Sequence, residues 1–493
     1  MLRKIRLLLA TVCFTLITLL FLDFTGTLHH WAGWLAKVQL VPAVLALHFG
    51  IVAALVVLTL IFGRLYCSVL CPMGVLQDLI AHLHRRLNRK HHYAYHKPLP
   101  WLRYAFVVIF VALLVGGVAS LATLIAPYSA YGRIATHLFA PVYALGNNAL
   151  AFLAERLDSY AFYPTEIWLK GGITLAVAAA TLLVVGTLAW RYGRMYCNTI
   201  CPVGTVLGLL ARFSWLKVGI DADKCIHCGA CERICKGLCI DSKNAHIDYS
   251  RCVACGNCVG ACHQGGLTYR HQPPSQQSTA AATADTSRRA FLAATGTLAV
   301  TAAFAEATKK VDGGLAAIED KVIPERQHPI LPAGSKDAAH FHQHCTACQL
   351  CIAECPNGVL RPSDDLDTLM QPVMSYERGY CRPECTRCSE VCPTGAISLI
   401  DRAQKAGTKI GTARWIAQNC IINTDGVACG NCARHCPAGA ITMRPVHPDD
   451  PESKKVPMID PERCLGCGAC EYLCPARPLS AIVVDGICQH REV

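Results

Sequence analysis

The apolar residues of this chain are concentrated in its first half, where they form four stretches long enough to cross a lipid bilayer. A helix spans the hydrocarbon core with about 20 apolar residues. The four stretches have this length and are nearly free of charge: Ile5–Leu22, Val41–Phe62, Ala105–Ala126 and Gly171–Trp190. A cleavable secretory signal is a poor interpretation of the first stretch, because three further stretches follow it and no small-residue cleavage site is evident. The pattern therefore predicts a bundle of four membrane spans.

The second half of the chain has no stretch of this kind and no strong helical periodicity. Short apolar patches follow cysteine-rich loops and predict short strands. Examples are Gly395–Ile400, Gly439–Thr442 and Leu479–Val484. This half therefore reads as a loop-rich α+β domain.

Charge indicates how the bundle is oriented. The amino terminus carries Arg3, Lys4 and Arg6, and seven basic residues against one acid (Asp78) lie between the second and third stretches. By the positive-inside rule, the amino terminus, this loop and the region after Trp190 are cytoplasmic. The net charge of +12 is therefore mostly a signal of topology. A nucleic-acid partner is not indicated, because no basic residues interleave with aromatic ones on a soluble face.

Six sets of four cysteines account for 24 of the 31 cysteines. The prevailing spacing, C-x2-C-x2-C-x3-C, is typical of [4Fe-4S] clusters, in which one loop supplies three thiolates and the fourth cysteine usually reaches the partner cluster. In the carboxy-terminal half, the first gap of the second set has three residues and that of the third has eight. The six sets are Cys225, Cys228, Cys231 and Cys235; Cys252, Cys255, Cys258 and Cys262; Cys345, Cys348, Cys351 and Cys355; Cys381, Cys385, Cys388 and Cys392; Cys420, Cys429, Cys432 and Cys436; and Cys464, Cys467, Cys470 and Cys474.

Zinc and disulfides explain these sets poorly. Zinc sites use two C-x2-C pairs separated by a spacer, and cysteine-dense disulfide scaffolds are small secreted domains. Four of the six sets also end in Cys-Pro, as bacterial ferredoxin motifs do. We therefore expect six [4Fe-4S] clusters that carry electrons.

The apolar pattern and the cysteines together predict four parts. A four-span α-helical membrane domain covers 1–213, and an α+β ferredoxin-like module with two clusters covers 214–272. A linker with a fifth apolar segment covers 273–305, and a polyferredoxin domain with four clusters covers 306–493. Which sets of the last domain share clusters is left open: the first with the second and the third with the fourth, or one pair nested inside the other.

The membrane domain contains a repeat with four more cysteines. FGRLYCSVLCPMG over 62–74 matches YGRMYCNTICPVG over 192–204, which indicates two structural repeats of a helical hairpin. Cysteines four residues apart share a helix face, and pseudo-symmetry would bring the two pairs together at the cytoplasmic edge. Two interpretations stay open: a four-thiolate redox or metal site, or conformational thiols without metal. The cysteines are Cys67, Cys71, Cys197 and Cys201.

The linker carries a candidate export signal. Arg288 and Arg289 precede Phe-Leu and an apolar run to Ala305, which resembles a twin-arginine signal in mid-chain. The alternative is a fifth ordinary span with two flanking arginines. In both cases the arginines stay inside and the following domain lies outside.

A substrate site is harder to predict. No dinucleotide fingerprint, P-loop or C-x2-C-H haem site occurs. His48, inside the second stretch, is a candidate proton acceptor and cofactor-binding residue, because an intramembrane ionisable residue is a functional candidate by default. His30, Tyr128 and His137 are weaker candidates near the outer face, and a purely structural role is as good an interpretation of each.

The four stretches, the two C-x3-C-P pairs and the two-cluster module resemble the NapH/MauN family of membrane ferredoxins. The part from about residue 285 is similar to the NapG/MauM family of exported four-cluster ferredoxins, so the chain looks like a natural fusion of the two. The resemblance implies a quinol dehydrogenase of a bacterial inner membrane, with the two-cluster module cytoplasmic and the four-cluster domain periplasmic.

In that family, electrons pass from the membrane quinone pool to a periplasmic reductase, such as nitrate reductase, or to a cytochrome. The alternative is an accessory protein for metal-centre maturation or transcriptional control. Under either function, the path by which electrons would cross the bilayer stays open. Two clusters lie inside and four outside, and only the C-x3-C-P pairs lie between them.

Overall fold

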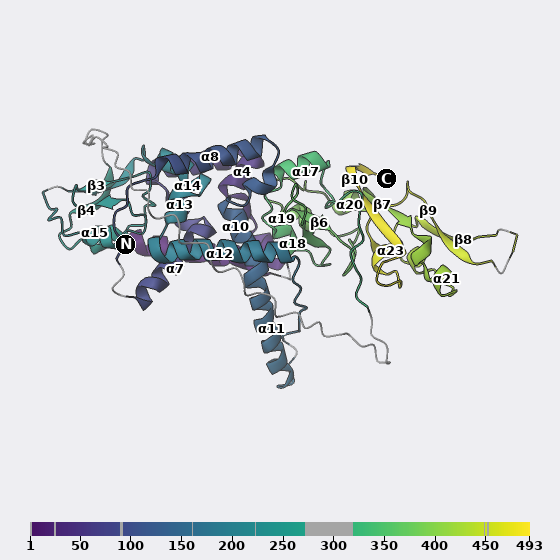
Figure 1. Ribbon diagram of the computed structural model, residues 1–493. Coiled ribbons are helices and arrows are strands. Elements are labelled where there is room, and N and C mark those ends of the chain that lie inside the picture. Colours follow the sequence, from purple (N-terminus) through teal and green to yellow (C-terminus); the bar gives the residue numbers. More distant parts are fainter. Residues whose placement is uncertain are drawn as a thin grey trace, which may run out of the picture.

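The computed structural model describes residues 2–23, 26–88, 92–159, 161–221, 223–271, 319–447, 449–450 and 453–493. The described parts form an elongated row (Figure 1). A module with two cysteine sets (the two-set module, 214–271) lies at one end, a helical bundle (2–211) in the middle, and a domain with four sets (the four-set domain, 319–493) beyond it. The predicted linker and arginine pair, over 273–305, lie outside the described residues.

Two helices of the bundle are long and apolar enough to cross a membrane among the described residues. They are α1 (Leu2–Leu22) and α12 (Gly172–Tyr192), which match the first and fourth predicted stretches. The apolar helices α5 (Phe49–Phe62) and α8 (Pro100–Val115) are shorter. The structure thus gives two candidate spanning helices where the sequence predicts four spans.

The second and third stretches are interrupted by backbone turns. Helix α4 (Leu40–Leu45) ends before Leu47, which has a φ of 53° in the left-handed region, and α5 starts after His48. Helix α8 ends at Gly116, and Gly117 follows with a φ of 78°. A left-handed residue breaks the ladder of hydrogen bonds along a helix. Apolar content alone did not reveal these turns.

The short helices α2 (Thr27–Ala32), α3 (Trp34–Lys37) and α9 (Ala119–Ala122) complete this part of the bundle. Its interior holds α10 (Pro127–Ile134), whose eight residues are all buried, and a π-helical turn, η1 (Ala135–Phe139). Helix α11 (Ala140–Glu155) then leaves the body at a steep angle to α12 (Figure 1). Most of its apolar side chains are exposed, including those of Val142, Leu145 and Leu153.

The predicted repeat forms two matching helix pairs. Helices α6 (Leu65–Val69) and α7 (Pro72–Leu87) correspond to α13 (Met195–Thr199) and α14 (Pro202–Ala211). Pro72 and Pro202 each occupy the first helical turn, where the missing N–H of proline costs no hydrogen bond. Each cysteine pair is thus followed directly by a new helix.

The two-set module is built from two similar halves. Strand β1 (Leu216–Ile220) pairs antiparallel with β4 (Leu267–His271), and β2 (Ile240–Asp241) pairs with β3 (His246–Ile247). Helices α15 (Ala230–Ile234) and α16 (Asn257–Ala261) each follow a cysteine loop.

The four-set domain consists of short elements in two units. The first contains α17 (Ala338–His344), α18 (Leu350–Ala353), β5 (Leu360–Pro362), β6 (Pro372–Met374) and α19 (Arg387–Val391). The second contains α20 (Arg402–Gly407), β7 (Thr408–Trp415), the 3₁₀ turn η2 (Ala417–Asn419), α21 (Ile421–Thr424), α22 (Asn431–Arg434), β8 (Ile441–Pro445), β9 (Lys455–Ile459), α23 (Ala469–Tyr472) and β10 (Ile482–Glu492).

The predicted strands of this domain are confirmed in part. Strand β10 pairs antiparallel with β7, and β8 pairs with β9. The predicted strands near 439–442 and 479–484 therefore exist, with later starts at Ile441 and Ile482. The strand predicted over Gly395–Ile400 is wrong, because this segment forms bends.

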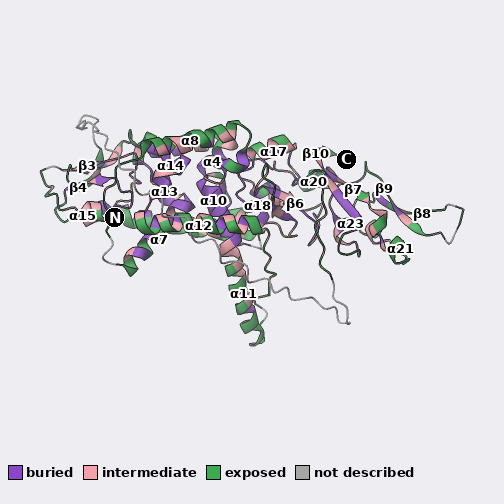
Figure 2. Cartoon of the chain, in the orientation of Figure 1, coloured by how far each residue is buried: buried purple, intermediate pink, exposed green. Residues whose placement is uncertain are grey.

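The bundle and the four-set domain share one hydrophobic core. A single buried cluster runs from Ile17 and Tyr131 of the bundle through Leu350 and Tyr376 to Val484 of the far domain. The two-set module has a separate core around Val218 and Ile240. The buried residues in the middle of the row are shown in Figure 2. The four-set domain is thus joined to the bundle by apolar packing, and the contacts of the two-set module with the bundle are largely polar.

Candidate metal centres

The cysteines of the four-set domain gather in fours, and each four takes its last member from another set. One cavity is lined by Cys420, Cys429, Cys432 and, from the last set, Cys474. A second cavity is lined by Cys464, Cys467, Cys470 and, from the third set, Cys436. In the first unit, Cys345, Cys348 and Cys351 lie within electrostatic range of Cys392. Cys381 and Cys388 lie within range of both Cys385 and Cys355. The first set therefore pairs with the second, and the third with the fourth.

We call these groups the first centre (with Cys348), the second (with Cys381), the third (with Cys420) and the fourth (with Cys464). In the two-set module, too, a centre takes its last cysteine from the other set: Cys252, Cys255 and Cys258 share a cavity with Cys235. In the remaining set, Cys231 lies within electrostatic range of Cys225 and Cys228.

The surroundings of the sulfur atoms fit iron–sulfur clusters. Backbone N–H groups donate to the sulfurs of the last cysteines: Ile397 to Cys392 at 3.5 Å, Ala440 to Cys436 at 3.3 Å, and Ala481 to Cys474 at 3.3 Å. Such bonds stabilise thiolates and tune cluster potentials.

No three His, Cys, Asp or Glu side chains among the described residues are placed to hold a metal ion directly. A zinc ion needs its sulfur ligands about 2.3 Å away, whereas a cluster carries bridging sulfides between its irons.

The second and fourth centres are neighbours. The backbone N–H of Cys381 donates to the carbonyl of Cys467 at 2.9 Å. The hydroxyl of Tyr376 donates to the carbonyl of Gly466 at 2.7 Å, between the two centres. Lys405 donates to the sulfur of Cys381 at 3.2 Å and places a positive charge there. The centres are therefore arranged in the order first, second, fourth and third, which differs from the order of the motifs in the sequence.

The first centre lies against the bundle. A Cβ atom on Gly132 of α10 would collide with the carbonyl oxygen of Cys348, so only glycine permits this approach. His137 bonds Gln349 in the same loop at 2.8 Å. Arg133, fully buried, donates to the carbonyls of residues 123 and 124 at 3.2 Å. It also lies within electrostatic range of both Tyr196 and Cys348.

The four repeat cysteines come together inside the bundle. Cys67, Cys71, Cys197 and Cys201 are each 3% exposed, and Cys201 lies within electrostatic range of the other three. We call them the four-thiol site. Hydrogen bonds also reach the sulfurs: Gln77 donates to Cys197 at 3.1 Å, and the N–H of Gly204 to Cys201 at 3.3 Å.

The two repeats hold each other through exchanged arginines. Arg64 donates to the carbonyl of Cys197 at 3.1 Å, and Arg194 donates to the carbonyl of Cys67 at 2.6 Å. Both arginines are fully buried. Arg64 also donates to the carbonyl of Ser250, in the cysteine loop of the two-set module, at 3.1 Å. It therefore bridges the four-thiol site and that module.

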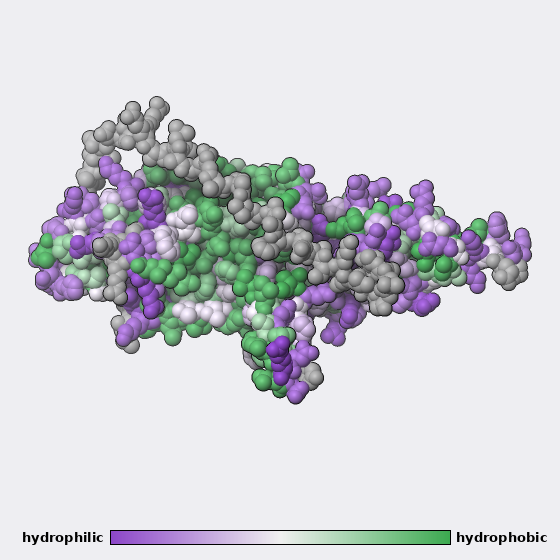
Figure 3. Space-filling model, turned by 60° about the horizontal axis from the view of Figure 1, so that its bottom comes forward, coloured by the Kyte–Doolittle hydropathy of each residue, from purple (hydrophilic) through white to green (hydrophobic). Residues whose placement is uncertain are grey.

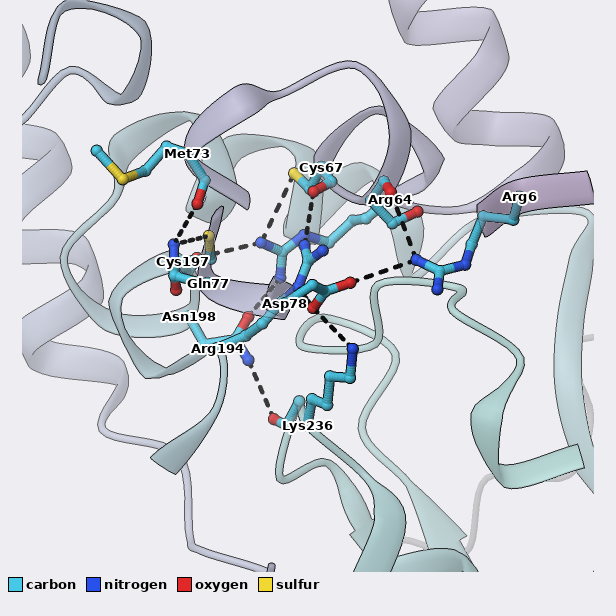
Figure 4. A network of polar contacts seen from close by, with 12 residues as sticks. Arg6, Arg64, Cys67, Met73, Gln77, Asp78, Arg194, Cys197, Asn198 and Lys236 are labelled. Atoms are coloured by element: carbon cyan, nitrogen blue, oxygen red, sulfur yellow. Dashed lines mark hydrogen bonds and ion pairs between the residues drawn. The ribbon is translucent and has the colours of Figure 1, made fainter. Parts of the chain in front are cut away.

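A charged network joins the two-set module to the bundle (Figure 4). Asp78 of α7 lies 2.8 Å from Arg194, 3.2 Å from Lys236 and 3.4 Å from Arg6. Burial opposes ionisation of Asp78, but Arg194 and Lys236 outweigh it and hold the pKa of the carboxyl well below its ordinary value. One carboxylate therefore links α1, the second repeat and the two-set module.

The four residues that the sequence offers for a proton or cofactor site lie in different environments. His48 is exposed at the start of α5, at the turn that interrupts the second apolar stretch. Tyr128 and His137 are buried, and both lie beside the cysteine loops of the first centre. His30 lies in α2 and stacks edge-on against Trp31.

Sequence reasoning used Asp78 and the basic residues only as topology signals and did not anticipate this network. The signal for Arg64 and Arg194 was present, since each follows glycine at the same place in the two repeats.

Comparison with known proteins supports the iron–sulfur assignment. A family model described as "4Fe-4S binding domain" matches residues 45–90 and 173–221, and one described as "4Fe-4S dicluster domain" matches 427–477. The four-thiol cysteines are the only ones inside the first match.

Several curated proteins are similar to parts of the chain. The methylamine utilization ferredoxin-type proteins MauM of Methylophilus methylotrophus and Paracoccus denitrificans are each 30% identical, over 31% and 32% of this chain and 69% and 73% of their own lengths. The MauM protein of Methylobacillus flagellatus is 30% identical, and the chain spans 63% of its length. The ferredoxin-type protein NapF of Escherichia coli is 27% identical over 31% of this chain. No solved structure matches.

Proposed function

The chain belongs to the family of MauM ferredoxin-type proteins, and from that premise we propose that it is a quinol dehydrogenase that passes electrons to an acceptor outside the membrane. It is an iron–sulfur electron-transfer protein related to MauM and NapF. The proposal adds the donor, membrane quinol, and the acceptor, a periplasmic reductase such as nitrate reductase or a cytochrome. It also adds six [4Fe-4S] clusters held by the 24 cysteines.

The contact between the first centre and the bundle carries the proposal. A soluble ferredoxin has no need to share a core with an apolar bundle, whereas this domain does. On the face shown in Figure 3, much of the visible bundle surface is apolar, and the two ends of the row are mostly hydrophilic. An apolar band of this kind suits a bilayer. The cluster domain thus sits where electrons from a membrane-soluble donor would enter it.

The four-thiol site supplies the missing relay in this proposal. Arg64 lies between it and the two-set module. On the other side, Tyr196 lies within electrostatic range of Cys201 and of Arg133, which in turn lies within range of Cys348. We assign an iron–sulfur cluster to the four thiols, because soft thiolates favour such a centre and the sulfurs already accept hydrogen bonds. The two groups of clusters are then one path for electrons.

The test of donor and direction uses the purified protein with its clusters in lipid nanodiscs. A menaquinol or ubiquinol analogue is added anaerobically, and cluster reduction is followed by electron paramagnetic resonance. We expect reduction by at least one quinol. Reduction by a soluble ferredoxin alone, with none by quinol, would contradict the proposal and favour an accessory or regulatory role.

The proposed orientation has its own test. Cys488 is an exposed thiol on strand β10, outside the cysteine sets. A membrane-impermeant maleimide added to intact spheroplasts should label it, and Cys488→Ser should lose that label. Labelling that requires lysis would place the four-set domain in the cytoplasm.

A further inference from the structure

A cavity of about 400 Å³ lies where the bundle meets the four-set domain. Its volume falls in the range of small-molecule sites, about 300 to 1,000 Å³. We propose that it binds the head group of the quinol; this inference rests on the proposed function. Its walls combine aromatic, charged and cluster-ligand side chains: Tyr143, Glu166, Trp168, Lys170, Cys355 and Arg378.

The cavity is reachable from a bilayer. Its wall includes Phe21 and Leu22, the last residues of α1, and Lys170, two residues before α12 begins. Each of the two candidate spanning helices therefore has one terminus at the cavity. The start of α11 forms another wall, and the exposed apolar face of that helix continues outward from it. An isoprenoid tail lying along this surface would stay in an apolar environment while the head group occupies the cavity.

The cavity is in direct contact with an electron acceptor. Cys355 lines it and belongs to the second centre, with Cys381, Cys385 and Cys388. A quinol ring in the cavity therefore touches a cluster ligand. The second centre neighbours both the first and the fourth, so electrons that enter here can move along the row towards the third centre. His48 lines no part of this cavity.

An unpartnered hydroxyl marks the cavity as a binding site. Thr136 lines it and is 6% exposed, and its hydroxyl oxygen is buried with no hydrogen-bond partner among the described residues. A buried hydroxyl without a partner is costly. A quinol oxygen would supply that partner. On another wall, the guanidinium of Arg378 lies 5.2 Å from the ring centre of Trp168 and 3.4 Å from Glu166.

The reaction at this site balances as a two-electron oxidation. The two O–H bonds of the quinol break, and the product is the quinone. An oxidised iron–sulfur cluster held by Cys355, Cys381, Cys385 and Cys388 would be the oxidant and would accept the two electrons one at a time, passing each on before the next. The two protons pass to solvent on the outer side, by way of the exposed carboxylate of Glu166 in the cavity wall.

Photoaffinity labelling tests the location without relying on turnover. The complete protein in nanodiscs is illuminated with an azido-substituted ubiquinone, and labelled peptides are identified by mass spectrometry. We expect the label on segments that contain Tyr143 or Trp168, and competition by unmodified quinone. Label confined to the segment around His48 would overturn the inference.

Kinetics of a matched pair of variants provide the second arm. Thr136→Val keeps the shape and removes the hydroxyl; we expect the KM for quinol to rise about 5- to 10-fold, as the loss of one hydrogen bond implies. Cluster potentials should not change. Thr187→Val, at an exposed threonine of α12, should leave KM unchanged. If the wild-type protein takes electrons from quinol but both variants match it, only the cavity assignment fails; if the wild type takes none, the proposed function fails.

Discussion

Replacement of Asp78 by asparagine should loosen the two-set module from the bundle. The change keeps the size of the side chain and removes its charge. Arg194, Lys236 and Arg6 then remain without their shared anion, and each of these side chains is at most 6% exposed. Buried cations without a counterion are strongly destabilising, because the desolvation of each charge is no longer offset.

The expected size follows from the geometry. Removal of one partner from a buried ion pair costs about 3–5 kcal/mol. The three pairs share one carboxylate, so their contributions do not add, and we take this range for the whole network. At about 1.4 kcal/mol per factor of ten, local opening of the interface should become roughly 100- to 4,000-fold more frequent.

Hydrogen exchange measures this opening directly. The backbone N–H of Arg194 donates to the carbonyl of Lys236 at 2.9 Å and therefore reports on the interface. Its exchange should accelerate by the factor given above in Asp78→Asn. Glu462→Gln is the matched control, because it removes an exposed pair with Arg491 and should change stability by less than about 1 kcal/mol.

A double variant tests whether stranded charge is the cause. Lys236→Met in the Asp78→Asn background removes one of the unpaired cations, and part of the lost protection should return. Equal exchange at Arg194 in Asp78→Asn and in the Glu462→Gln control would refute the reasoning, since the network would then contribute no more than a surface pair.

Three further outcomes are expected. Cys201→Ser should lower the iron content by one centre and leave the ferredoxin-type signals intact, whereas Cys13→Ser, on α1, should change neither; unchanged iron in both would contradict the relay. Gly132→Ala should slow electron transfer between the bundle and the first centre. Gly146→Ala should not, because no neighbour in the described parts of the chain lies within 4 Å of the added methyl; equal rates would exclude the Gly132 contact from the path. The pKa of Asp78 is depressed in the folded state. The contribution of this carboxylate to the stability of the interface should therefore be complete above the ordinary aspartate pKa of about 3.9 and fall only as the pH drops further. Loss of protection at the Arg194 N–H already near pH 6 would contradict this.

The iron–sulfur chemistry of the chain could be predicted from the spacing of its cysteines along the sequence. A cluster loop takes three ligands from one short segment, so the cysteine sets and the two C-x3-C-P repeats are visible in the sequence. Which sets exchange their fourth ligands could not be predicted, because Cys474 and Cys436 reach their centres through tertiary packing.

The bundle was less predictable, because its turns, its buried arginine and its cavity do not follow from a local sequence pattern. Hydropathy counts apolar residues but does not detect a left-handed turn at Leu47 or Gly117. The burial of Arg133 likewise depends on tertiary structure, because the backbone carbonyl of residue 123 accepts its hydrogen bonds. The cavity at Cys355 is formed by α1, η1, α11 and the four-set domain together, and no single segment carries a pattern for it.

The exchange of ligands between the third and fourth sets has a consequence for how the protein is made. When Cys420, Cys429 and Cys432 have left the ribosome, their fourth partner, Cys474, is still to be synthesised, and so is β10, the partner strand of β7. The third and fourth centres can therefore close only late in translation. Until then this unit presents open thiolates to the cell. Cluster delivery must wait for the completed fold or be guarded by a chaperone, and any transport of the finished domain must follow that step.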